Sequence, residues 1–129
     1  MNTGTYSIGV GDTINNINYD GTEEMNFTYT HESEDENDKY YSLKSVALHV
    51  SNNGEVIDGG GDGEFVVRLI SHINPNGIYD IVIFRQDMSE VSDILWEPDN
   101  PIKFSSYDIL KFEWANPNNL TWGVILSTT

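Results

Sequence analysis

The end of the chain limits its possible folds more than any other part of the sequence. Residues 108–114 and 120–126 each alternate apolar with polar or small side chains. The polar loop between them, residues 115–119, contains one Pro and three Asn. Alternation with a period of two predicts β-strands with one buried face, and such a loop predicts a turn. We therefore expect a terminal β-hairpin that lies in a sheet and ends inside the fold.

The two Trp residues of this segment share the phase of its apolar side chains. Trp114 alternates in phase with Leu110 and Phe112, and Trp122 alternates in phase with Val124 and Leu126. Side chains of one phase lie on the same face of a sheet. Both rings are therefore expected in the core rather than on a ligand-binding surface.

The remaining sequence also favours strands over helices. Residues 65–70 and 78–84 are apolar on both phases, which predicts a pair of central strands covered on both faces, with a tight turn at Asn76 and Gly77. In residues 41–50 the apolar phase shifts near Ser45 and Val46, which indicates a β-bulge. The spacing of apolar residues allows at most one short helix, over residues 88–95.

Length and composition predict one domain with a packed core. The chain has 129 residues and no Cys, so disulfides and thiolate metal sites are excluded. No linker divides it, and residues 1–129 are expected to form a single domain. Short strands separated by Gly- and Asn-rich turns predict an all-β fold, an antiparallel β-sandwich of jelly-roll type.

The chain is strongly acidic. Six Lys and Arg against 21 Asp and Glu give a formal net charge of −15. Five of the acids lie in residues 32–38, which we expect to form a solvated loop. Such a surface repels phosphate, so nucleic acid is not an expected partner. Neither a signal peptide nor a membrane-spanning segment is apparent, and the expectation is a chain made in the cytoplasm that does not bind membranes.

Residues that could carry chemistry are few and scattered. His31, His49 and His72 lie in separate segments without the spacing of a metal site, and no nucleophile motif is present. We therefore expect no enzymatic activity, no catalytic residues and no cofactor. Carboxylates alternate with glycine over residues 58–64, so Asp58, Asp62 and Glu64 are candidates for a calcium site, with a mobile polar loop as the alternative.

One aromatic residue is a candidate for ligand binding. Trp96 lies beside a polar stretch, residues 97–100, and is expected to be more exposed than Trp114 and Trp122. With the calcium candidates, it motivates an alternative function as a carbohydrate-binding, lectin-like module, in which aromatic rings stack on sugars.

The absence of a catalytic motif, the β domain without Cys and the acidic surface favour a structural or assembly protein. The Asn- and Thr-rich β-sandwich that ends with residues 108–126 resembles, in general style, the small accessory proteins of tailed-phage virions, such as capsid decoration or cement proteins. The resemblance implies a bacteriophage virion protein that forms a homo-oligomer, a trimer or other ring. It also implies docking on the major capsid protein or another virion protein, which stabilises the shell.

Overall fold

The computed structural model describes residues 5–7, 13–30, 40–71, 80–105 and 107–129, and within them the chain forms ten strands and no helix. The strands are β1 (Thr5–Ser7), β2 (Thr13–Gly21), β3 (Met25–Thr30), β4 (Tyr40–Ser51), β5 (Glu64–Ile70), β6 (Asp80–Asp87), β7 (Asp93–Trp96), β8 (Ile102–Ser105), β9 (Ile109–Trp114) and β10 (Thr121–Thr128). The predicted acidic loop at residues 32–38 and the turn at residues 76 and 77 lie outside the described residues.

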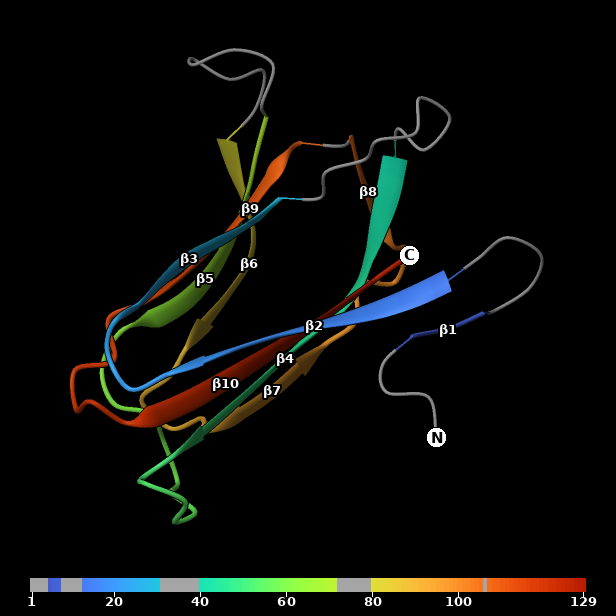
Figure 1. The fold of residues 1–129 in the computed structure, drawn as a ribbon. Helices are drawn as coiled ribbons and strands as arrows, with labels where there is room; N and C mark the ends of the chain where they lie inside the picture. The colour runs from blue at the N-terminus through green and yellow to red at the C-terminus, as the bar shows by residue number, and fades with distance from the viewer. Residues whose placement is uncertain (1–4, 8–12, 31–39, 72–79, 106) are drawn as a thin grey trace.

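The strands form two antiparallel sheets that face each other (Figure 1). The six-stranded sheet has the order β1-β2-β10-β4-β7. β7 and β8 lie on the same side of β4 and pair with different halves of it. The four-stranded sheet has the order β3-β9-β5-β6. This arrangement confirms the predicted all-β antiparallel sandwich.

The predicted terminal hairpin is wrong, because β9 and β10 belong to different sheets. β9 lies between β3 and β5, whereas β10 lies between β2 and β4. The two strands form a β-arch, that is, consecutive strands whose apolar faces meet across the core. Alternation shows that a strand has one buried face, but it does not show which strand lies beside it.

Side-chain hydrogen bonds of Asn116 hold the loop of this β-arch. Its side-chain nitrogen donates to the carbonyls of Glu23 (3.0 Å) and Leu120 (2.9 Å), and its side-chain oxygen accepts from the Leu120 N–H (2.9 Å). Asn116 has a φ of 47°, a left-handed conformation that Asn tolerates better than most residues. The Glu23 carbonyl also accepts from the Trp122 indole at 2.8 Å. The β-arch is thereby connected to the loop between β2 and β3.

Four connections between the sheets gather at the same end of the sandwich, on the left in Figure 1. They are residues 22–24, 52–63, 88–92 and 115–120. Register explains their proximity: Trp122 lies opposite Gly21, Thr121 opposite Ser51 and His49 opposite Asp93. β2, β10, β4 and β7 therefore each meet a crossing at this end.

The helix allowed over residues 88–95 does not form. Residues 88–92 make a turn instead, and β7 begins at Asp93. The turn is held by the glycine loop, since the Gly60 N–H donates to the carbonyls of Met88 (2.7 Å) and Val91 (3.0 Å). Met88 is fully buried. Tertiary burial of this side chain thus overrides a weak helical pattern.

Aromatic rings join the two sheets in the core. The ring of Phe27 stacks on those of Tyr19 (4.2 Å between centroids) and Phe112 (4.8 Å). Trp114 and Trp122 are buried, as their phase predicted. The predicted bulge is confirmed, because β4 holds Lys44 as an extra residue between Leu43 and Ser45, which lie opposite Thr128 and Ser127.

The second strand of the predicted central pair lies elsewhere in the sheet. β5 is an inner strand, but β6 pairs only with β5 among the described strands and therefore forms an edge. Its register with β5 shifts after Val67, which leaves Ile83 as the extra residue of a second bulge. Apolar side chains on both phases of β6 therefore do not mean that the strand is central or that the described chain covers both of its faces.

Candidate functional site

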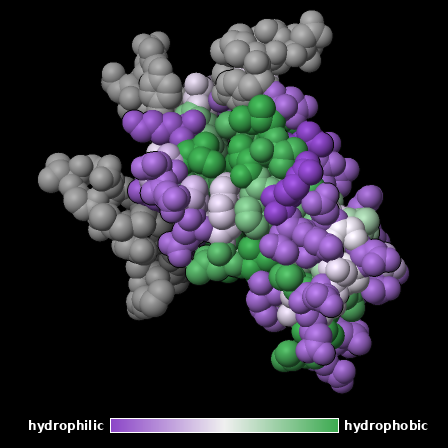
Figure 2. Space-filling model, turned by 180° about the vertical axis from the view of Figure 1, so that it is seen from behind, coloured by the Kyte–Doolittle hydropathy of each residue, from purple (hydrophilic) through white to green (hydrophobic). Residues whose placement is uncertain are grey.

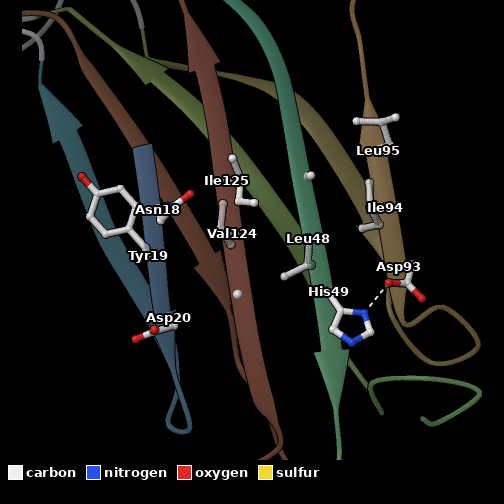
Figure 3. Close-up of a pocket in the computed structure, with 12 residues that line it drawn as sticks. Asn18, Tyr19, Asp20, Leu48, His49, Asp93, Ile94, Leu95, Val124 and Ile125 are labelled. Carbon is white, nitrogen blue, oxygen red and sulfur yellow. Dashed lines mark hydrogen bonds and ion pairs between the residues drawn. The ribbon is translucent and has the colours of Figure 1, made fainter. Parts of the chain in front are cut away.

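The outer face of the six-stranded sheet carries a groove of about 530 Å³ across β2, β10, β4 and β7 (Figure 3). Strand register sets its outward side chains in rows. One row reads Asp20, Gly123, His49 and Asp93, and the next reads Asn18, Ile125, Ala47 and Leu95.

The second row is the apolar part of this groove. Leu95 is 67% exposed and Ile125 is 46% exposed, and the small side chain of Ala47 lies between them. Large hydrophobic side chains this exposed on adjacent strands form a small patch that water solvates poorly. Gly123 adds no side chain to the neighbouring row, so the surface is hollow beside Ile125.

The rim of the groove is acidic. Asp20 and Asp93 lie at opposite ends of the first row, and Nδ1 of His49 contacts Oδ1 of Asp93. Among the described residues that line the groove, none is Lys or Arg. The rim therefore attracts a cationic group, while the apolar row favours contact with an apolar one.

A second, polar hollow of about 550 Å³ continues the same face. It is lined by Asn16, Ser45 and Ser127, by the prolines Pro98 and Pro101, and by the charged residues Lys44, Glu97 and Asp99. Its two carboxylates outnumber its one cation. The acidic character of the groove thus extends along the sheet.

The outer face of the four-stranded sheet has a different character. Arg68 lies near its middle and donates through Nε to Glu113 (2.9 Å) and through Nη1 to Asp80 (3.4 Å). The hydrogen bond to Glu113 is the main cause that raises the pKa of Arg68. Lys111 and Arg85 lie on the same face, so cations and carboxylates are mixed there.

Hydrophobic side chains also gather on the side of the molecule seen in Figure 2, where hydrophilic residues surround them. Half-buried residues of β6, β7 and β8 pack against the core along one side of the sandwich, namely Ile83, Phe84, Ile94, Trp96 and Ile102. Ile81 at the start of β6 is 49% exposed.

Trp96 is less accessible than the sequence suggested. It is half-buried, packs against the core and stacks on Phe84 with 4.8 Å between ring centroids. One face of the indole is therefore covered. The groove on the six-stranded sheet does not include it.

The calcium candidates are exposed, and the loop that carries them is packed against its neighbours. In the described part of the chain, no three His or carboxylate residues are placed to hold a metal ion, which includes Asp58, Asp62 and Glu64. Gly60 is buried, and a Cβ there would lie 2.8 Å from Trp114. The loop thus has a structural role between β4 and β5.

Of the three histidines, only His49 falls within the described residues, and it lies exposed on the groove. Sequence reasoning missed the groove because its residues come from four separate strands. One signal was present in the sequence: Ile125 is apolar on the phase opposite to Trp122, Val124 and Leu126.

Comparison with models of protein families and with curated proteins finds no match to this sequence. The described part of the chain contains no helix with the length and apolar character needed to cross a bilayer.

Proposed function

We propose that this chain is a non-enzymatic assembly protein that docks through the groove on a basic protein surface. The most specific form of the proposal is a virion accessory protein that forms a homo-oligomer, binds the major capsid protein and stabilises the capsid shell. The observation that carries it is the exposed apolar row of Ile125 and Leu95 beside a rim with Asp20 and Asp93.

The strand order supports this class of protein. Without β1 and β8, the eight remaining strands can be counted from one to eight along the chain. The two sheets then have the orders 1-8-3-6 and 2-7-4-5. We infer from this wiring that the sandwich is a jelly roll, the fold of many viral capsid and lectin domains. A fold alone does not assign a function, so the proposal depends on the groove.

The groove can supply both affinity and specificity. Contact with a partner would remove Leu95 and Ile125 from water, at roughly 25 cal/mol per Å² of apolar surface. The carboxylates of Asp20 and Asp93 would accelerate association with a basic partner and select against acidic ones. Several such contacts on one particle would add avidity.

The test is co-sedimentation with capsid shells of the virus that encodes the chain. The wild-type protein is expected to bind and to raise the temperature at which shells open. Leu95→Lys should abolish binding, because it replaces the most exposed apolar side chain of the row with a cation. Lys103→Glu on β8 outside the groove serves as the control for a change of charge. Wild-type protein that fails to bind shells would refute the proposal.

The lectin-like alternative has less support from the residues that motivated it. The indole of Trp96 is covered on one face by Phe84, and the calcium candidates do not converge. A glycan-binding screen, with thermal melting in the presence and absence of calcium, tests this alternative directly.

A further inference from the structure

The outer face of the four-stranded sheet mixes aliphatic side chains with charged ones. Its outward phase carries four aliphatic side chains, Val66, Ile70, Val82 and Ile109, and all four are half-buried. No described strand lies over this face (Figure 1). The sequence predicted cover on both sides of β5, and the described part of one chain supplies it on only one side. A partner on the outer face would complete it.

Charge on this face is nearly balanced. Arg68, Arg85 and Lys111 provide three cations against the four carboxylates of Glu64, Asp80, Asp87 and Glu113, a net charge of −1, whereas the whole chain carries −15. Two acidic chains repel each other least where their charges cancel locally. Of the two outer faces, this one therefore repels a second copy less, because the groove and the polar hollow carry Asp20, Asp93, Glu97 and Asp99 against Lys44 alone.

Register determines which side chains of two copies would face each other. Three full rows of its outward side chains are Asn26, Glu113, Val66 and Arg85; then Thr28, Lys111, Arg68 and Val82; then Thr30, Ile109, Ile70 and Asp80, and a short row of Glu64 and Asp87 lies beyond the first. A two-fold axis along the middle row, across the strands, places the first row of one copy over the third row of the other. Arg85 then faces Asp80, Val66 faces Ile70, Asn26 faces Thr30, and Glu113 lies over Ile109. The strands of the two copies stay aligned, as in ordinary packing of sheets.

We propose that two copies of the chain pair through this face of the four-stranded sheet about such an axis. The inference deepens the proposed function and depends on its oligomeric part, because it names the surface that self-associates. It gives a dimer, the commonest closed assembly, where the resemblance to decoration proteins implies a trimer. It leaves the groove on the opposite side of each chain open to a capsid.

The middle row makes a further, directional prediction. Arg68 is already neutralised by Glu113 and Asp80 of its own chain. Lys111 of the two copies would face each other at the axis, which is a contact between like charges. Lys111→Ser should therefore tighten the dimer several-fold, whereas loss of a cation from an unrelated acidic surface would weaken association.

The experiment is sedimentation velocity of the purified chain from about 1 to 100 µM, with circular dichroism to confirm that each variant is folded. The wild-type chain should sediment as a monomer–dimer equilibrium. Arg85→Asp and Asp80→Arg should each raise the dimer Kd about tenfold or more. The double variant should restore it, because the exchanged charges face each other again. Lys103→Asp, with the same change of charge as Arg85→Asp, should have little effect.

Two further variants distinguish this face from the side of the sandwich at β6 as the surface that self-associates. Ile109→Ser on β9 should weaken the dimer, and Ile81→Ser on edge strand β6 should not. The opposite result would place the contact at the side of the sandwich and overturn the inference. A trimer would also overturn it. A chain that stays monomeric at 100 µM would refute self-association altogether. Co-sedimentation with shells, through Leu95→Lys, tests docking independently of that result.

Discussion

β9 and β10 are closely matched strands with different surroundings. Each is an inner strand of its own sheet, each has two antiparallel neighbours, and their inward side chains meet in one core. They differ on the outward phase. β9 presents Ile109, Lys111 and Glu113, whereas β10 presents Gly123 and Ile125 with hydroxyl side chains at its ends. The inward phase therefore determines stability, and the outward phase determines which surface each sheet offers to a partner.

The largest expected effect tests the inward phase. Trp114→Ala and Trp122→Ala should each lower the free energy of unfolding by about 3–5 kcal/mol, because each leaves a cavity in the core. Trp96→Ala, in which the lost side chain is only half-buried, should cost less than either. Guanidinium unfolding followed by circular dichroism measures all three. Equal losses at the three positions would show that β9 and β10 do not contribute the centre of the core.

The next effect concerns the loop that joins the two strands. Asn116→Ala removes three hydrogen bonds and leaves the polar groups of Leu120 without that partner, so we expect a loss of about 2–3 kcal/mol. Asn118→Ala, at an exposed position of the same loop, should change stability by about 0.5 kcal/mol or less. Urea unfolding of both variants checks this. If the two losses are similar, Asn116 does not hold the β-arch.

Substitutions at Gly21 and Gly123 test core packing and groove binding separately. A Cβ at Gly21 would lie 2.8 Å from Cζ2 of Trp122, so Gly21→Ala must displace a buried ring and should cost about 1–2 kcal/mol. At Gly123 the nearest atom to such a Cβ is the Tyr19 carbonyl oxygen, at 3.9 Å. Gly123→Ala should therefore change stability by no more than about 0.5 kcal/mol. Its methyl group enters the groove, and co-sedimentation with shells should show weaker binding.

The sequence predicted which side chains are buried better than it predicted which strands are neighbours. Alternation placed Trp114 and Trp122 in the core, and the phase shift near Ser45 located a bulge. Alternation is a local property, so it could not show that residues 115–120 join two sheets. That involves the hydrogen bond from Asn116 to the carbonyl of Glu23, 93 residues earlier in the chain.

The candidate site was less predictable than the fold for a related reason. Its apolar row joins Ile125, Ala47 and Leu95, which become neighbours only through the pairing of β10 with β4 and of β4 with β7. Motif searches favour residues close in sequence, such as Asp58 to Glu64, and these do not converge. Apolar residues on the outward phase were the available signal. Such residues are compatible both with an exposed surface suited to a partner and with a central strand covered on both faces.

The smallest effect on stability gives the sharpest test of the comparison. Ile109→Ser on β9 and Ile125→Ser on β10 replace equivalent outward residues of the two sheets. Their effects on the free energy of unfolding should be within about 1 kcal/mol of each other, because neither side chain belongs to the core. Their effects on assembly should separate completely: Ile109→Ser weakens the dimer and leaves docking intact, and Ile125→Ser does the reverse. Sedimentation velocity and co-sedimentation with shells measure the two effects. If either variant changes both, the outer faces do not act independently, and one partner must contact both sheets.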